Sequence, residues 1–134
     1  MGRLIEQSVY FVATPARVFR LYADAREHAR FSGGPVVLER RVGGKFEAFG
    51  GMIWGRMLVI EPGKLIVQQW RSVHFKKADV DSTLVLTFRK KGKGCQVDLV
   101  QVNVPKQDFQ GVMKGWPKYY WGPMKRALSG KKGE

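Results

Sequence analysis

An alternation of apolar and polar side chains, with a period close to two, runs through residues 36–104. This period is typical of β-strands, because successive side chains of a strand point to opposite faces of its sheet. Short glycine-rich turns interrupt the alternation. Turns of this length join antiparallel neighbours, whereas a parallel crossover needs about a dozen residues or more. The stretch therefore predicts an antiparallel meander of six strands, at residues 36–42, 44–50, 52–61, 64–75, 82–90 and 95–104.

The segment GGKFEAFGGMIWG at residues 43–55 raises a separate question, because glycine-rich segments can also cradle phosphate groups. Its glycines lie between predicted strands, and no Lys-Ser or Lys-Thr pair follows them as the P-loop signature requires. The pairs at 43–44 and 50–51 are instead expected to form turns with positive φ. Gly55, inside a strand, predicts a bulge or a strong bend of the sheet.

Helical periodicity precedes the meander. After a first strand at residues 4–11, Thr14 provides an N-cap and Pro15 a first-turn proline, and residues 13–28 predict a helix. A short second helix is expected to continue from there until the Gly-Gly-Pro sequence at 33–35 ends it.

Helical periodicity also follows the meander. Beyond Pro105 the apolar residues keep helical spacing to the end of the chain, which predicts one long C-terminal helix. Asp108 or a neighbouring residue is expected to cap it, at the positive end of the helix dipole. Pro117 lacks the N–H of an intrahelical hydrogen bond, so we expect a bend there, with two separate helices as the alternative.

The predicted sheet has one apolar face, which another element must cover. The alternation assigns nine side chains to that face: Phe46, Ala48, Ile66, Trp70, Leu84, Leu86, Phe88, Val97 and Leu99. Only the C-terminal helix is long enough to cover them, so the sheet must curl around it. The prediction is an α+β helix-grip fold, with a curved antiparallel sheet of six to seven strands and two short helices after the first strand. We expect one domain over residues 1–134, with a flexible basic tail at 129–134.

The chain is strongly basic, with 24 Lys and Arg against 11 Asp and Glu and a formal net charge of +13. Such a charge favours polyanionic partners. The basic residues gather at 89–94, a predicted hairpin tip, and at 124–134, where charge is easily solvated. We interpret them first as a solvated surface, with an anion site as the alternative. No specific nucleic-acid binding is expected, because no groove-reading helix or aromatic platform motif accompanies them.

Two further features concern where the protein resides. Its single cysteine, Cys95, excludes an internal disulfide, which is usual for a reducing compartment. No stretch approaches the roughly twenty apolar residues of a membrane span. We therefore predict a cytoplasmic location without a membrane span.

The sequence offers little for catalysis or for metal binding. His28, His74 and Cys95 do not stand at zinc spacing. Cys95, beside a basic hairpin tip, is either a reactive thiol or an incidental strand residue. Most acidic residues lie at turns or on the polar phase of their strands, and none is expected on the apolar face, so a cyclase-like pair of carboxylates is the minor alternative. We expect a non-catalytic protein that requires no cofactor and no metal.

Two glutamines interrupt the apolar face and are the strongest candidates for ligand contacts. Gln68 lies in phase with Trp70, and Gln101 follows two residues of the same face. A buried amide without a partner costs about 1–3 kcal/mol, and an apolar pocket with a few polar groups is the usual form of a small-ligand site. The alternatives are a structural amide with internal partners or a phase slip that turns the side chain outward. The candidate ligand-binding residues are Tyr22, Phe46, Gln68, Trp70, Gln101, Trp116 and Tyr120.

The aromatic residues leave a similar choice open. Trp70, Trp116 and Tyr120 either fill the core or line a ligand pocket. Trp54 and Trp121 are expected on the opposite phase, where they would form an exposed apolar patch ringed by Lys and Arg. Such a patch would suit a protein contact.

Six motifs occur in order between residues 43 and 125: GGKF, GG-x-I-x-G, P-x-K-x-I-V-x-x-WR, S-T-L-x-L-T-F, VP-x-x-D and GW-x-x-YYW-x-x-x-K. With them the chain resembles the C-terminal domain of the activator of heat-shock protein ninety ATPase, over roughly residues 8–128. That domain belongs to the helix-grip superfamily, together with START domains, polyketide cyclases and the birch-pollen allergen.

The resemblance implies a helix-grip fold, which often encloses a cavity between helix and sheet. It favours a non-catalytic domain that binds a small apolar or amphipathic ligand in that cavity. The alternative is a co-chaperone-like module whose basic surface contacts a heat-shock chaperone. The separate N-terminal domain of the eukaryotic co-chaperone, which carries the principal chaperone contact, is not expected in this chain.

Overall fold

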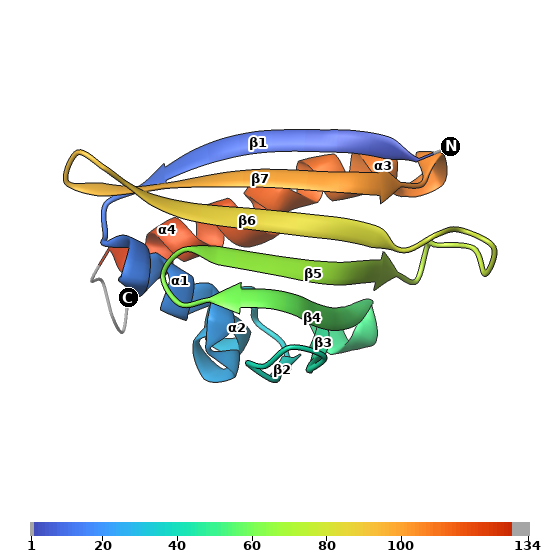
Figure 1. Ribbon diagram of the computed structural model, residues 1–134, viewed down its shortest axis with the longest axis horizontal. Coiled ribbons are helices and arrows are strands. Elements are labelled where there is room, and N and C mark those ends of the chain that lie inside the picture. The colour runs from blue at the N-terminus through green and yellow to red at the C-terminus, as the bar shows by residue number, and fades with distance from the viewer. Residues whose placement is uncertain (1, 130–134) are drawn as a thin grey trace.

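The period-two stretch folds into a curved antiparallel sheet (Figure 1). In the computed structural model, which describes residues 2–129, seven strands follow the order β1-β7-β6-β5-β4-β3-β2. All neighbours are antiparallel, which confirms the predicted meander and adds the N-terminal strand at its edge. The strands are β1 (Arg3–Phe11), β2 (Val37–Leu38), β3 (Lys45–Ala48), β4 (Ile53–Glu61), β5 (Leu65–Ser72), β6 (Ser82–Lys91) and β7 (Gly94–Val104).

Turn chemistry shortens the first strands of the meander. The strand expected over 36–42 is only Val37–Leu38, because Glu39 begins a turn in which its Oε1 accepts a hydrogen bond of 2.9 Å from the backbone N–H of Lys45. The strand expected over 44–50 ends at Ala48. A 3₁₀ turn, η1 (Phe49–Gly51), follows it, and Gly50 and Gly51 there have φ values of 65° and 93°.

Gly55 marks a close approach between two strands. A Cβ atom at this position would lie 1.7 Å from the carbonyl oxygen of Gln69 in the paired strand β5. The register shift of β4 occurs further on, between Met57 and Val59. The predicted bulge is therefore present in the strand, but it lies beyond Gly55.

Two short helices follow β1, as predicted, but the break between them lies earlier than expected. They are α1 (Pro15–Ala23) and α2 (Ala25–Ser32). Thr14 caps α1 through its side chain, in agreement with the prediction. Asp24 interrupts the predicted helix 13–28, because its carboxylate accepts hydrogen bonds of 2.9 and 3.0 Å from the backbone N–H groups of Arg26 and Glu27 and so caps α2.

The C-terminal residues form one continuous helical path along the concave side of the sheet (Figure 1). It consists of α3 (Lys106–Gly115), a π-helical segment η2 (Trp116–Trp121) and α4 (Gly122–Leu128). The backbone stays helical at both junctions, with φ near −60° at Trp116 and Gly122. The N–H of Gly122 bonds to the carbonyl of Pro117, five residues back. The π-helical segment thus accommodates the proline that predicted a bend.

The core lies between the concave face of the sheet and the helices. All nine side chains that the alternation assigned to this face are buried, which confirms the strand phases. Within residues 2–129 no helix is both long and apolar enough to cross a membrane. The basic tail predicted at 129–134 lies, from residue 130 onward, outside the described residues.

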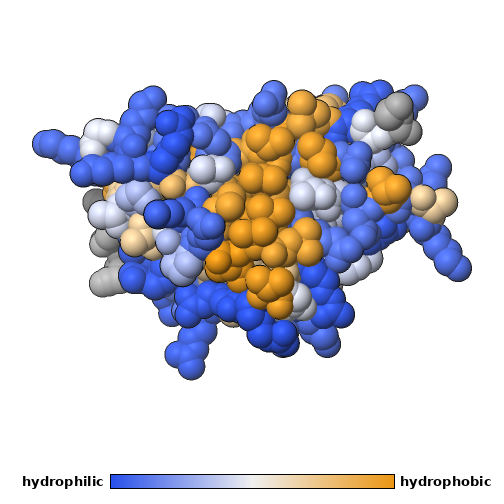
Figure 2. Space-filling view, in the orientation of Figure 1, coloured by the Kyte–Doolittle hydropathy of each residue, from blue (hydrophilic) through white to orange (hydrophobic). Residues whose placement is uncertain are grey.

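The convex face of the sheet carries a line of four valines. Strand pairing places Val59 opposite Val67, and Val67 opposite Val85. Val85 in turn lies opposite Val100. We call these four residues the valine stripe. Figure 2 shows an apolar band crossing this face between hydrophilic flanks.

Candidate functional site

A cavity of about 470 Å³ lies between the C-terminal helix and the ends of β4 and β5. Its inner wall is formed by the buried rings of Trp70, Trp116 and Tyr120. Tyr119 and Met52, each 48% exposed, lie at its mouth. The cavity is therefore open to solvent at one side and aromatic in its interior.

Local backbone features help to form this cavity. Phe49, which lines it, has a φ of 54°, a left-handed conformation that is unfavourable for a side chain of this size. Its ring packs edge-on against those of Tyr119 and Tyr120, with centroid separations of 5.8 and 5.7 Å. On the helix, Gly111 and Gly115 also line the cavity, and their lack of side chains leaves space there.

A buried carboxylate also lines the cavity. Asp108 lies in the first turn of α3, but it does not cap the helix as predicted: Pro105 is the cap residue, and its carbonyl accepts from the N–H of Asp108 at 2.9 Å. The Asp108 carboxylate instead accepts a hydrogen bond of 2.5 Å from the Ser72 hydroxyl at the end of β5. Ser72 Oγ accepts in turn from the backbone N–H of His74 at 3.0 Å. These bonds tie the start of α3 to the sheet.

The expectation that acidic residues stay off the apolar face is wrong for Asp108, which is only 6% exposed. A signal for this placement exists in the sequence. Asp108 precedes Val112 by four residues and Trp116 by eight, so all three fall on one helical face. The predicted capping role assigned the Asp108 side chain to the end of the helix and not to this buried face.

The seven candidate ligand residues separate into two groups. Trp70, Trp116 and Tyr120 line the cavity. The other four, which are buried outside its lining, are Tyr22, Phe46, Gln68 and Gln101. The structure thus brings the aromatic candidates together and places the two glutamines behind them.

Both glutamines have internal partners. Gln68 Oε1 accepts a hydrogen bond of 2.7 Å from the Tyr22 hydroxyl, and Gln68 Nε2 donates to Met57 Sδ at 3.3 Å. Gln101 Oε1 accepts from Trp116 Nε1 at 2.9 Å. Gln68 Oε1, Gln68 Nε2 and Gln101 Oε1 therefore have the hydrogen bonds of structural amides.

Two buried donors near the cavity have no hydrogen-bond partner within residues 2–129. They are Trp70 Nε1 and Gln101 Nε2. Trp70 belongs to the cavity wall, and Gln101 bonds to the wall residue Trp116. Unpaired buried donors cost about 1–3 kcal/mol each.

A buried histidine supports the cavity wall from behind. His28 Nδ1 lies 2.8 Å from the carbonyl of Tyr22, so this nitrogen must carry the proton and donate it. Nε2 then accepts a hydrogen bond of 2.9 Å from the Tyr120 hydroxyl. Burial lowers the pKa of His28 to about 4, despite the raising effect of the backbone hydrogen bond to Tyr22. Burial likewise raises the pKa of Tyr120, so both groups are neutral near pH 7.

Burial corrects one further expectation, for Trp121, and decides between the two alternatives for Cys95. Trp121 is not on the surface: its ring is buried and its Nε1 donates to Gln7 Oε1 at 2.8 Å, so the expected patch of Trp54 and Trp121 does not form. Cys95 is fully buried and its pKa is raised by desolvation, which contradicts a reactive thiol.

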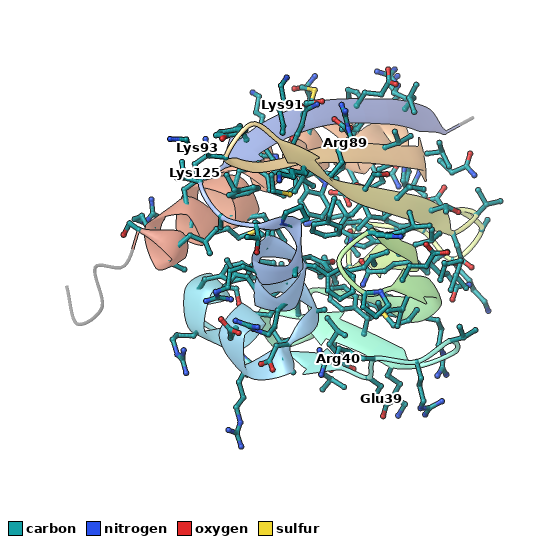
Figure 3. All side chains as sticks on the ribbon, turned by 60° about the vertical axis from the view of Figure 1, so that its left-hand side comes forward. Glu39, Arg40, Arg89, Lys91, Lys93 and Lys125 are labelled. Atoms are coloured by element: carbon teal, nitrogen blue, oxygen red, sulfur yellow. The ribbon has the colours of Figure 1, made fainter. Side chains whose placement is uncertain are left out.

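The predicted basic hairpin tip lies at the same end of the molecule as the last helix (Figure 3). Figure 3 shows Lys91 and Lys93 of the β6–β7 hairpin and Lys125 of α4 at the same end of the molecule, away from Glu39 and Arg40. We call Lys91, Lys93 and Lys125 the basic end. Within the described part of the chain none of the three forms an ion pair, whereas the neighbouring Arg89 pairs with Asp98 at 2.9 Å.

Comparison with known proteins shows which family has a similar sequence. The family model described as "Activator of Hsp90 ATPase homolog 1-like protein" matches residues 12–129. The activator of 90 kDa heat shock protein ATPase homolog of Dictyostelium discoideum is 29% identical over 120 residues, which are 89% of this chain and 31% of that protein. The human homolog 1 is 26% identical over 118 residues, covering 88% of this chain and 35% of the human protein. The chain thus spans about a third of the length of these curated relatives.

Solved structures of other proteins have the same fold. An Hsp90 activator from Plasmodium falciparum superposes with a TM-score of 0.82, 26% identity and 96% coverage of both chains. The Aha1 dimer from Colwellia psychrerythraea gives a TM-score of 0.81 over 98% of this chain and 99% of that one, and its 15% identity supports the fold alone. The helix-grip prediction is confirmed, and this chain belongs to the family of activator of Hsp90 ATPase homolog 1-like proteins.

Proposed function

We propose that the chain is a non-catalytic binding domain, which holds a small molecule with an apolar body in the cavity between the C-terminal helix and the sheet. The observation that carries this proposal is the cavity itself. Its volume of about 470 Å³ falls within the range of roughly 300–1,000 Å³ that is usual for small-ligand sites. Its aromatic interior would remove an apolar ligand from water.

The polar groups of the site favour binding over chemistry. A cyclase-like acid–base reaction would use two carboxylates, and within residues 2–129 the lining contains one, Asp108. The lining also contains one histidine, His74, which is exposed. The buried His28, behind the wall, has both ring nitrogens engaged by protein partners. Neither of its nitrogens is available to a substrate in this arrangement.

A ligand panel tests this function. Thermal unfolding and tryptophan fluorescence should show saturable binding of some apolar compounds, with one molecule bound per chain in native mass spectrometry. Val85→Thr is the matched control, because Val85 lies on the convex face and should leave binding unchanged. If no apolar or amphipathic compound binds up to its solubility limit, the proposal is wrong.

A second candidate function is contact with a heat-shock chaperone in the cytoplasm. Two surface features favour it beside the family membership. The valine stripe is an apolar surface that a partner could cover, with Val59 37% exposed. The basic end would attract an acidic partner surface and accelerate its association.

The ATPase rate of the organism's own Hsp90 tests this second function. Addition of the chain should change the rate, and Lys91→Glu with Lys93→Glu should weaken the effect because the attraction becomes repulsion. Lys106→Glu with Lys114→Glu, both exposed on α3 and away from the hairpin (Figure 1), is the charge-matched control. No binding and no rate change at saturating concentration would contradict this function without affecting the first.

A further inference from the structure

The charge inside the cavity is opposite in sign to the charge of the chain. The sequence contains 24 Lys and Arg against 11 Asp and Glu. Within residues 2–129, the cavity lining contains one carboxylate, Asp108, and one histidine, His74, but neither lysine nor arginine. A carboxylate ligand, such as a fatty acid, would therefore meet a negative charge and no fixed cationic side chain in the cavity.

The charge of Asp108 is only partly compensated. The carboxylate receives one hydrogen bond, from Ser72 to Oδ2, and forms no ion pair within residues 2–129. Its position in the first turn of α3 provides some compensation through the helix dipole. A carboxylate that is only 6% exposed usually requires a cationic partner as well.

Access to Asp108 is open on the side that carries no hydrogen bond. A Cβ atom at Gly111 would lie 3.6 Å from Asp108 Oδ1, so this oxygen lies under the surface that the glycine leaves free. Gly111 is exposed and belongs to the cavity lining. A ligand that enters past Gly111 can reach Oδ1 without displacing Ser72.

The cavity walls also favour a cation. Trp70, Trp116 and Tyr120 present aromatic rings, whose faces attract cations and disfavour anions. The rings of Trp116 and Tyr120 lie 4.6 Å apart and form one continuous wall. An ammonium group beside these rings would gain from them as well as from the carboxylate.

We propose that the cavity selects apolar amines: the ammonium group of the ligand pairs with Asp108 Oδ1, and its apolar body lies against Trp70, Trp116 and Tyr120. This inference rests on the proposed binding function and names the ligand class for the same site. An opposing explanation is that Asp108 is purely a structural tie to Ser72. The two explanations differ in what happens when the charge of Asp108 is removed while its hydrogen bond is kept.

Three probes with the same alkyl body distinguish these explanations: decylamine, 1-decanol and decanoate. Each is titrated into the full chain below its aggregation concentration, at a salt concentration that screens the overall positive charge. We expect decylamine to bind at least about tenfold more tightly than 1-decanol, as a charge-assisted hydrogen bond allows, and decanoate to bind most weakly. The positive net charge of the chain favours decanoate over decylamine. The opposite order of affinities would therefore have to come from the cavity.

Variants assign the preference to one residue. Asp108→Asn keeps an acceptor for Ser72 and should abolish the preference for decylamine while 1-decanol still binds. Asp108→Glu should retain the preference. Glu6→Gln, on the exposed face of β1, changes the net charge equally and should leave the order unchanged.

The results distinguish a failure of this inference from a failure of the proposed binding function. Equal binding of the amine and the alcohol by the unaltered chain, or an amine preference that survives Asp108→Asn, would overturn this inference and leave the binding function intact. Failure of all three probes to bind would overturn the inference and also count against the binding function. The comparison of probes in the unaltered chain remains decisive if Asp108→Asn does not fold.

Discussion

The Tyr120 hydroxyl donates a hydrogen bond of 2.9 Å to Nε2 of His28, which joins the cavity wall to helix α2. His28 is fully buried, and its ring also lies 4.7 Å from that of Tyr22. The position of a cavity residue thus depends on a histidine that remains neutral. This dependence makes the stability of the fold sensitive to pH.

We predict that stability falls as the pH drops from about 6.5 to about 4. Burial lowers the pKa of His28 to about 4, whereas the unfolded chain protonates this group near 6.5. Between these values the unfolded state binds more protons, so the free energy of unfolding decreases as the pH falls, by about 3 kcal/mol in total from this group. Urea unfolding at several pH values measures the slope of the free energy of unfolding against pH. His28→Gln should remove the contribution of His28 to this slope. His74→Gln, which changes an exposed histidine, should keep it. An unchanged slope in His28→Gln would contradict the assignment.

The Tyr22–Gln68 hydrogen bond yields a second prediction. Tyr22→Phe leaves Gln68 Oε1 without its donor, and Gln68→Leu leaves the Tyr22 hydroxyl without its acceptor. Each single change should cost about 1–3 kcal/mol, because a buried polar atom loses its partner. The double variant should cost less than the sum, with a coupling energy of about 1 kcal/mol. Urea unfolding of the four proteins measures the cycle, and additive effects would show that the bond contributes little.

The same variants test whether Gln68 contacts a ligand. Its hydrogen bonds to Tyr22 and Met57 indicate a structural amide, so Gln68→Leu should keep the affinity of the cavity for apolar ligands while it lowers stability. Loss of affinity without loss of stability would instead support the ligand-facing alternative.

The fold was predictable because its signals are local. Strand period, glycine turns and the Thr14 cap each act within a few residues, and the short turns predicted the neighbours of strands β2 to β7. The pairing of β1 with β7 joins the two ends of the sheet sequence and was not predicted. The helix boundary at Asp24 was missed for the same reason. Residues 13–28 keep a helical pattern across the break, and only the orientation of one carboxylate ends α1 and begins α2.

The site was predictable only in part, because its polar contacts join distant residues. Trp70, Trp116 and Tyr120 could be assigned to the inner face from their spacing. The partners of Gln68 and Asp108 could not: Tyr22 is 46 residues from Gln68, and Ser72 is 36 residues from Asp108. Periodicity gives the face on which a polar side chain lies, but it cannot show which group receives its hydrogen bond.

Gly55 gives a prediction about the bend of the sheet. A Cβ atom there would lie 1.7 Å from the carbonyl oxygen of Gln69, so Gly55→Ala must push β4 away from β5. We expect a loss of more than about 2 kcal/mol, since the clash is with backbone of a paired strand. Gly34→Ala is the control, because a Cβ atom at Gly34 meets nothing within 4 Å. Chemical unfolding measures both variants, and a small effect of Gly55→Ala would show that the strands separate easily.

The last prediction separates ligand binding from stability at one position. Gly111 lines the cavity within α3, and the space beside it is wide enough for a Cβ atom, 3.6 Å from Asp108 Oδ1. Gly111→Ala should therefore stabilise the helix by up to about 1 kcal/mol through its higher helix propensity. Gly111→Leu should gain similarly in propensity, but its side chain would cover Asp108 and occupy the entrance. We expect the affinity for apolar ligands to fall by at least about tenfold in Gly111→Leu, the loss of about 1.4 kcal/mol of binding free energy, and to change little in Gly111→Ala. Thermal unfolding and ligand titration of the two variants measure these effects, and full affinity in a stable Gly111→Leu would show that ligands do not enter the cavity past this residue.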